Sequence, residues 1–298
     1  MALFKYGILF MSALGLLSDV VADAGSGNAP EWPGVSLRKI YDYTYECTFN
    51  SSVLGRKMNF SLILPPDYER KTALPVMFVL HGLGRDHLTV VSNEKLRRNF
   101  VDAGFVTVFP DGKHGWYIDS EVKPDSKFQS YLTELITMVK AHLKVSRQPE
   151  QWVIIGWSMG AFGSANYVMR NPGVFKTMGT VIGLLDFPNS SYAKADNFGV
   201  SALFPQDESR WEQYQAARFP ECFNAMNIIQ FVGRTAFDAK MNRAFHAALL
   251  KADIPHEYIE VDGGHQWSVV EKGLPRLLEF AVKSTAGKRS RQVYSIGN

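Results

Sequence analysis

The residues Gly156, Ser158 and Gly160 form the pattern G-x-S-x-G, which can present a serine hydroxyl for nucleophilic attack. An apolar run at 152–155 precedes the pattern, and a segment with helical character follows it as far as Arg170. A serine between a strand and a helix lies on a strained turn, where only glycines two positions away avoid collisions with both elements. This context favours Ser158 as a nucleophile over a serine that merely occupies a tight turn.

A catalytic serine needs an imidazole that removes its proton and a carboxylate that holds that imidazole in the right tautomer. Where the serine follows a strand in this way, the acid and then the histidine come later in the chain. Chain order excludes four of the seven histidines, which precede Ser158: His81, His87, His114 and His142. His246 lies in a helical pattern and His256 begins a strand, whereas His265 lies on the turn after an apolar run at 258–261. We therefore predict that His265 is the base.

The acid must lie between Ser158 and His265, on a loop that follows a strand. Asp238 ends the loop 233–238 after the apolar run 228–232, just before a helix. It could instead be a helix N-cap, and Asp186, after the preceding strand, is the rival acid. Asp262 is too near His265 in sequence, and Asp207 lies in an irregular segment. Loop placement favours Asp238.

Acyl transfer passes through an oxyanion that requires two aimed hydrogen-bond donors. We predict the backbone N–H groups of Met159, which follows the nucleophile, and of Leu83, on the glycine-containing loop after the run 76–80. Gly82 is the alternative to Leu83. His81, which begins that loop, is interpreted as a structural hydrogen-bonding residue.

Four aromatic residues fall on loops at the predicted carboxyl ends of strands, where ligands bind in parallel sheets. We expect either a substrate pocket or plain packing from these residues: Trp116, Tyr117, Trp157 and Trp267.

The elements that must position these residues alternate between strands and helices, which predicts a mostly parallel sheet with helices on both faces. Alternating polar and apolar residues at 40–49 and 59–64 predict antiparallel edge strands before it. Continuous apolar runs predict buried strands at 76–80, 105–109, 152–155, 178–182, 228–232 and 258–261. Helical patterns occupy 128–143, 161–170, 240–251 and 269–283. The long irregular segment 183–223 is interpreted as a cap insertion over the site.

The 298 residues fit one α/β domain, which we place at 35–284. Before it, Lys5, an apolar run at 6–17 and the small residues Ala22 and Ala24 predict a signal peptide at 1–24 and a linker at 25–34. The apolar run is too short for a stable membrane anchor. We expect a secreted or periplasmic protein with a solvated basic tail at 285–298.

Other classes of function find little support. A net charge of +3 is too small to indicate nucleic-acid binding. No metal-binding or dinucleotide-binding motif is present, so we expect no metal and no cofactor. Cys47 and Cys222 either pair in an oxidising compartment or remain free thiols. The sequence does not determine an oligomeric state.

The chain contains five motifs in this order: Leu80-His81-Gly82-Leu83-Gly84, Pro110-Asp111-Gly112, Gly115-Trp116-Tyr117, Gly156-Trp157-Ser158-Met159-Gly160 and Gly263-Gly264-His265-Gln266-Trp267. The ordered set, over residues 35–284, resembles the esterase D-like branch of the α/β-hydrolases. That branch includes tributyrin-type esterases, S-formylglutathione hydrolases, feruloyl and acetyl-xylan esterases, and mycolyltransferases. The resemblance implies an α/β-hydrolase fold with a short cap insertion.

The resemblance also implies Ser158 as nucleophile, Asp238 as acid, His265 as base, and the N–H groups of Leu83 and Met159 as the oxyanion hole. It departs from the usual pattern at Ala161, where many relatives have glycine, and in the loop that carries Asp238. The implied activity is hydrolysis of short-acyl or aromatic-acyl esters, either small molecules or esters linked to a polysaccharide.

Two alternatives remain open at the level of the sequence. The first is an acyltransferase that passes the acyl group to a sugar or an alcohol. The second, from another class, is a secreted binding protein on an inactive hydrolase scaffold.

Overall fold

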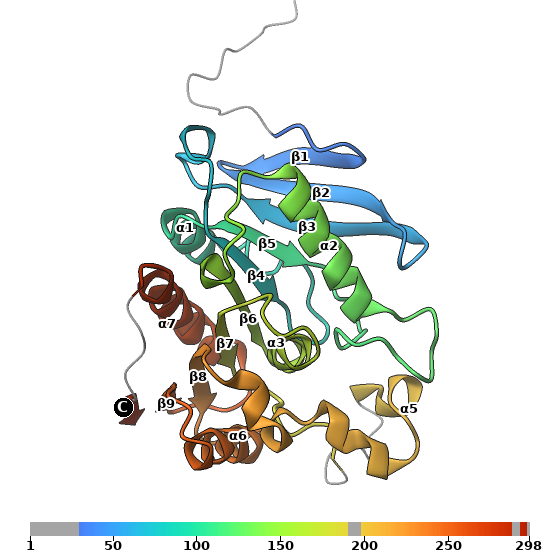
Figure 1. Cartoon of the computed structure of the whole chain (residues 1–298), viewed down its shortest axis with the longest axis vertical. Coiled ribbons are helices and arrows are strands. Elements are labelled where there is room, and N and C mark those ends of the chain that lie inside the picture. Colours follow the sequence, from blue (N-terminus) through green and yellow to red (C-terminus); the bar gives the residue numbers. More distant parts are fainter. Residues whose placement is uncertain (1–29, 190–197, 288–292, 297–298) are drawn as a thin grey trace, which may run out of the picture.

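The structure is a computed structural model that describes residues 30–189, 198–287 and 293–296. Within these residues, ten strands form one sheet in the order β1-β2-β3-β5-β4-β6-β7-β8-β9-β10 (Figure 1). The strands are β1 Val35–Tyr41, β2 Thr44–Ser51, β3 Arg56–Ile63, β4 Val76–Leu80, β5 Val106–Pro110, β6 Trp152–Trp157, β7 Thr177–Val181, β8 Asn227–Gly233, β9 Glu257–Val261 and β10 Val293–Ile296. This architecture confirms the expected α/β fold.

The sheet changes from antiparallel to parallel along its width. The strands β1, β2, β3 and β5 pair antiparallel, and every pair from β5 and β4 to β10 is parallel. The parallel register aligns Leu80 with Gly156 and Gly233 with Val261. The loops that follow β4, β6, β8 and β9 therefore leave the sheet at one edge, which is where the candidate residues lie.

Helices cover both faces of the sheet, with α1 and α7 on one face and α2, α3 and α6 on the other (Figure 1). The α-helices are α1 Glu94–Asp102, α2 Phe128–His142, α3 Met159–Arg170, α5 Val200–Leu203, α6 Ala239–Lys251 and α7 Trp267–Thr285. Short 3-10 helices are η1 Tyr68–Arg70, η2 Pro149–Gln151, η4 Glu208–Tyr214, η5 Ala216–Arg218 and η6 Pro220–Phe223.

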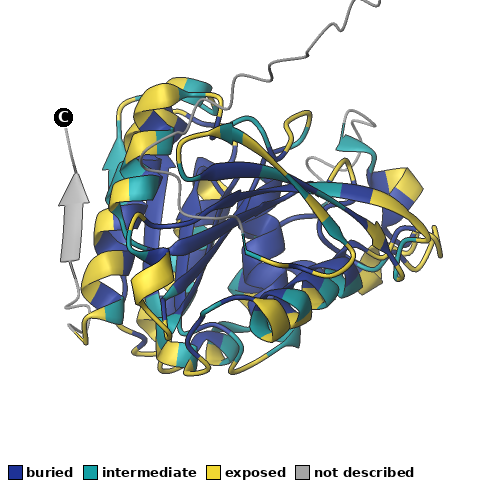
Figure 2. Ribbon diagram, turned by 90° about the horizontal axis from the view of Figure 1, so that it is seen from above, coloured by how far each residue is buried: buried dark blue, intermediate teal, exposed yellow. Residues whose placement is uncertain are grey.

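The central strands are buried on both faces (Figure 2), as their continuous apolar runs predict. Neighbouring residues point to opposite sides of the sheet, so Phe78 and Ile154 pack in the core beneath α2 and α3. Met77 and Val153 pack in the second core, against α1 and α7. This alternation gives each face of the sheet its own core, and the two cores together hold the strand ends in place.

The N-terminal part differs from the expected boundaries. The stretch 40–49, expected as one strand, crosses a hairpin, because Tyr41 ends β1, Thr44 begins β2, and Tyr43 between them has φ 58°. The segment 25–34, expected as a polar linker, contains a residue that belongs to the core. Its Trp32 is only 4% exposed and packs edge-on against Phe60, with 5.5 Å between the ring centroids.

Residues 183–223 form α5, η4, η5 and η6, apart from 190–197, which lie outside the described residues. The described part of this segment packs mainly against α3 and α6. Phe198 extends toward the strand ends, where its ring centroid lies 6.0 Å from that of Phe237. None of the described residues of the segment lines the cavity at Ser158.

The ends of the chain bear on three expectations. The signal peptide at 1–24 and the basic residues 288–291 lie outside the described residues. The expected tail contains a strand, because β10 pairs in parallel with β9. No helix among the described residues is long and apolar enough to cross a membrane.

Cys47, buried in β2, and Cys222, in η6, are free thiols.

Candidate active site

Ser158 lies at the junction of β6 and α3, with φ 54° and ψ −120°. Two glycines allow the strand and the helix to approach each other closely at this junction. A Cβ on Gly156 would lie 2.4 Å from the carbonyl carbon of Gly160, and a Cβ on Gly160 would lie 2.0 Å from the carbonyl oxygen of Leu80. Both distances are far below van der Waals contact, so the G-x-S-x-G spacing is a steric requirement of this turn.

The three residues predicted to act together are in hydrogen-bond contact. His265 Nε2 lies 2.9 Å from Ser158 Oγ, and His265 Nδ1 lies 2.6 Å from Asp238 Oδ1. With the carboxylate accepting from Nδ1–H, Nε2 is free to accept the serine proton. The geometry is that of a nucleophile, a base and an orienting acid.

Asp238 precedes α6 but makes no side-chain capping hydrogen bond to it. Its carboxylate is fully buried, and Oδ2 accepts a hydrogen bond of 2.8 Å from Asn242 Nδ2. The same amide donates to the carbonyl oxygen of Gly183, 2.7 Å away. Asn242 was not predicted, although its spacing of four residues from Asp238 on a helix could have indicated it. Among the described residues, the carboxylate that accepts from His265 is that of Asp238 and not that of Asp186, the rival acid, and burial raises the pKa of the Asp186 carboxyl.

The loop after β4 is held by His81, whose ring is buried. His81 Nδ1–H donates to the carbonyl oxygen of Gly82 at 2.8 Å, and Gly112 N–H donates to His81 Nε2 at 2.9 Å. Since the carbonyl of Gly82 and the N–H of Leu83 share one planar peptide, this bond turns the N–H of Leu83 the opposite way. Gly82 also approaches the nucleophile closely, because a Cβ on it would lie 3.3 Å from Ser158 Cβ.

Met159 is the first residue of α3, so its N–H has no partner within the helix. A helix N-terminus directed at the serine favours negative charge there. The N–H groups of Met159 and Leu83 therefore stay the predicted donors to the oxyanion.

A cavity of about 180 Å³ lies beside Ser158. Its wall includes two of the four predicted aromatic residues, Trp157 and Trp267, whose ring centroids are 6.0 Å apart. Ile182 and Val270 complete its apolar part. This cavity is the place beside the nucleophile where an acyl group can lie.

Trp116 and Tyr117 do not line this cavity, which corrects their expected place in a substrate pocket. Both have positive φ, near 53° and 54°, and their side chains are 1% and 0% exposed. Trp116 stacks on Phe187 with ring centroids 4.5 Å apart. Tyr117 lies under the oxyanion loop, where its hydroxyl accepts the N–H of His81 at 3.0 Å. The two residues support the site from within the core.

The sheet topology, the nucleophile turn and the Ser158–His265–Asp238 contacts define a serine hydrolase with the α/β-hydrolase fold. The chain belongs to the Esterase family, whose family model matches residues 51–280. The family resemblance predicted from the ordered motifs is thereby confirmed.

Solved structures show the same fold. A fluorophosphonate-binding serine hydrolase of Staphylococcus aureus has a TM-score of 0.73 and 17% identity, covering 80% of this chain and 98% of its own. An S-formylglutathione hydrolase from Agrobacterium tumefaciens has a TM-score of 0.70 and 20% identity, covering 84% and 98%. A ferulic acid esterase has a TM-score of 0.70 and 19% identity, covering 81% and 98%.

Curated relatives are similarly distant in sequence. An esterase of Mycobacterium tuberculosis is 24% identical over an alignment of 247 positions, which covers 73% of this chain and 54% of that protein. The S-formylglutathione hydrolase of Mus musculus is 23% identical over an alignment of 214 positions, which covers 64% of this chain and 72% of its own. The chain thus spans about half the length of the mycobacterial relative.

Proposed function

We propose that this protein is a secreted serine carboxylesterase that hydrolyses short-acyl esters through an acyl-enzyme on Ser158. The observation that carries the proposal is the unbroken contact from Ser158 Oγ through His265 to the buried Asp238, at the wall of a small cavity.

The reaction proceeds in two similar halves. His265 Nε2 takes the proton of Ser158 as Oγ attacks the ester carbonyl, and the N–H groups of Leu83 and Met159 stabilise the oxyanion. The imidazolium, held by Asp238, then gives its proton to the leaving alcohol. A water molecule, deprotonated by His265, attacks the acyl-enzyme and releases the free acid.

The size of the cavity supports a short acyl group. A space of about 180 Å³ is below the range of about 300–1,000 Å³ for sites that enclose drug-sized ligands. The relatives named S-formylglutathione hydrolase support a small acyl group as well, while those named ferulic acid esterase support an aromatic one. We place the preference at short acyl groups because the cavity is small and its wall includes the bulky side chains of Trp157 and Trp267.

The proposal is tested with 4-nitrophenyl esters from acetate to octanoate and with ethyl ferulate. We expect kcat/KM to peak at acetate or butyrate and to fall at least about tenfold by octanoate, since over-long chains do not fit. Replacing Trp267→Ala should move the peak to longer chains by enlarging the cavity. Ser268→Ala, an exposed serine on the same helix, should leave the profile unchanged. A profile that peaks at octanoate or ferulate would contradict the short-acyl assignment.

A further inference from the structure

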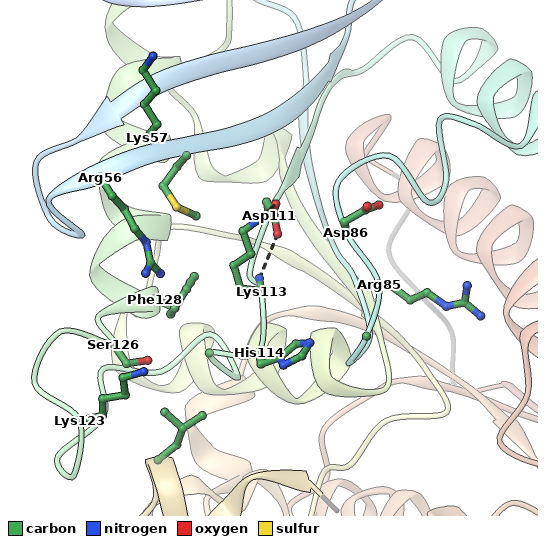
Figure 3. A pocket seen from close by; sticks show the side chains of 14 residues that line it. Arg56, Lys57, Arg85, Asp86, Asp111, Lys113, His114, Lys123, Ser126 and Phe128 are labelled. Atoms are coloured by element: carbon green, nitrogen blue, oxygen red, sulfur yellow. Dashed lines mark hydrogen bonds and ion pairs between the residues drawn. The ribbon is translucent and has the colours of Figure 1, made fainter.

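A second and larger cavity, of about 600 Å³, lies next to the catalytic one (Figure 3). It is bounded by the start of β3, by the loop after β5 and by residues 84–86 of the oxyanion loop. Five lysines and arginines line it, and we call it the cationic cavity: Arg56, Lys57, Arg85, Lys113 and Lys123. In Figure 3, Lys57 points away from it, while Arg56 and Lys123 point into the same space above and below Phe128.

The acids of the cationic cavity do not balance these charges. Asp111 is buried, which by itself would raise the pKa of its carboxyl, but an ion pair of 2.6 Å with Lys113 and a hydrogen bond from the Lys113 N–H help to hold that pKa well below its usual range. Asp86 Oδ1 accepts hydrogen bonds of 3.0 Å from Leu88 N–H and Thr89 Oγ1–H, so the Asp86 carboxylate stabilises the turn that it begins.

Four of these cations have no carboxylate partner among the described residues: Arg56, Lys57, Arg85 and Lys123. Arg56 and Lys123 point into the cationic cavity, whereas Lys57 and Arg85 point away from it (Figure 3). The Arg56 guanidinium lies 5.8 Å from the centroid of the Phe128 ring, which holds it over an apolar floor. Cations gathered in a concave wall repel one another, and a bound anion removes that repulsion. The guanidinium fork in particular matches carboxylate and phosphate oxygens. The cationic cavity is therefore suited to an anion.

The cationic cavity adjoins the reacting centre. Arg85 lines both cavities, and its guanidinium lies 5.6 Å from the ring centroid of Trp267, in the wall of the catalytic cavity. Gly84 lines the cationic cavity and follows Leu83, which lines the catalytic one. An ester bound at Ser158 can thus extend over this loop from one cavity into the other.

We propose that the cationic cavity binds carboxylate or phosphate groups on the alcohol part of the ester substrate. The acyl part is assigned to the smaller cavity, where Trp157, Trp267 and Val270 lie beside Ser158, so the part of the ester that reaches the cationic cavity is the alcohol. A volume of about 600 Å³ suits a sugar-sized group. The inference rests on the proposed esterase function and names its substrate class: acyl esters of acidic saccharides, with either a uronate carboxylate or a sugar phosphate.

The test compares acetate esters that differ only in charge: acetylated methyl glucoside, acetylated methyl glucuronide and acetylated glucose 6-phosphate. We expect kcat/KM for an anionic ester to exceed that of the neutral one by at least roughly tenfold. The advantage should shrink in about 0.5 M sodium chloride, which screens exposed charges. The ratio of the glucuronide to the phosphate identifies which anion is preferred.

The decisive variant is the double substitution Arg56→Gln with Lys123→Gln. It should abolish the advantage of the anionic esters and leave turnover of the neutral ester within about twofold. Lys95→Gln with Lys272→Gln, two exposed lysines on α1 and α7, makes the same change in net charge away from the cavity and should preserve the advantage. Equal kcat/KM for all three esters in the wild type, or equal loss in both double variants, overturns the inference.

A binding measurement separates this inference from the proposed function. Digalacturonate and glucose 6-phosphate are titrated calorimetrically into Ser158→Ala, whose cationic cavity is intact. We expect binding of at least one, weakened about tenfold or more by the Arg56 and Lys123 substitutions. Absence of binding to both overturns the inference even if 4-nitrophenyl acetate is hydrolysed. Binding without any ester hydrolysis overturns the proposed function alone.

Discussion

Ser158 adopts a backbone conformation that residues other than glycine rarely occupy, with φ 54° and ψ −120°. Such a conformation costs about 1–3 kcal/mol and persists where the surroundings over-determine it. Here its N–H donates to the carbonyl oxygen of Val181 at 3.1 Å, and its own carbonyl accepts the N–H of Phe162 at 3.1 Å. The strand and the helix together hold the serine where His265 can reach its hydroxyl.

The assignment of the acid gives a prediction with an internal control. Asp238→Asn keeps the shape of the side chain but removes the charge that holds the Nδ1–H tautomer of His265, so kcat should fall by about 10³–10⁴. Asp186→Asn, the rival position, should change kcat less than about threefold. Both are measured by 4-nitrophenyl acetate hydrolysis, with circular dichroism to verify folding. The reverse ranking would assign the acid to Asp186.

At the residue scale, chain order was sufficient to select the three residues that the structure brings together. Position in the sequence could not reveal how Trp116 and Tyr117 turn inward. Their positive φ values direct the side chains into the core, and space for Tyr117 exists only because Gly112 and Gly163 lack side chains. A Cβ on Gly112 would lie 2.3 Å from the Tyr117 ring, and a Cβ on Gly163 would lie 2.6 Å from it.

At the scale of elements, the buried parallel strands could be predicted from the sequence, whereas the bounds of the strands at the two sides of the sheet could not. The run 76–80 coincides with β4 because a strand buried on both faces must be apolar throughout. The hairpin between β1 and β2 turns at Asp42 and Tyr43 without a glycine, so no turn signal separated the two strands. The strand β10 is short and lies after a polar stretch, and its pairing with β9 depends on tertiary contacts that a pattern does not contain.

The contact between α6 and β9 predicts acid sensitivity. His246 Nδ1 and His256 Nε2 lie 2.7 Å apart, and the His246 ring stacks on Tyr258 with centroids 4.0 Å apart. Burial, reinforced by His256, lowers the pKa of His246 from 6.5 to about 4, and burial lowers the pKa of His256 as well. Both rings are therefore neutral in the folded protein at neutral pH.

Below about pH 6.5 the unfolded chain binds protons that the folded chain does not, so the free energy of unfolding decreases as the pH falls toward 4. We expect His246 to account for roughly 1–2 kcal/mol of this loss. His246→Phe keeps a ring over Tyr258 and should flatten the dependence, measured by urea denaturation from pH 7.5 to 4.5. His114→Gln, at an exposed histidine, should leave the slope as in the wild type. An equally steep slope in His246→Phe would locate the sensitivity elsewhere.

At the scale of the whole molecule, the carboxyl ends of the parallel strands carry a small cavity at the nucleophile and a larger, basic cavity beside it. The net charge of +3 gives no hint of this, because the basic residues of the cationic cavity come from β3 and two separate loops. Composition therefore led us to expect no nucleic-acid partner, but it could not indicate a local preference for anions. Only the folded arrangement gathers these charges.

The proposed export of the protein gives a prediction for the whole chain. Expressed in a host with a general secretory pathway, the protein should appear outside the cytoplasm with Gly25 as its first residue, because Ala22 and Ala24 match the small residues that signal peptidase reads. The intact mass of the exported protein identifies the signal-peptide cleavage site. Ala24→Lys should block processing. Protein that stays in the cytoplasm at full length would contradict secretion.

The central claim is that Ser158 is an activated nucleophile, and the most direct test is covalent labelling. Purified protein is treated with a fluorophosphonate probe, and the labelled peptide is located by mass spectrometry while 4-nitrophenyl acetate hydrolysis is followed in parallel. We predict one label on Ser158, loss of hydrolysis in proportion to labelling, and neither label nor hydrolysis in Ser158→Ala. Hydrolysis that survives in Ser158→Ala, or a label on another residue, would contradict the account.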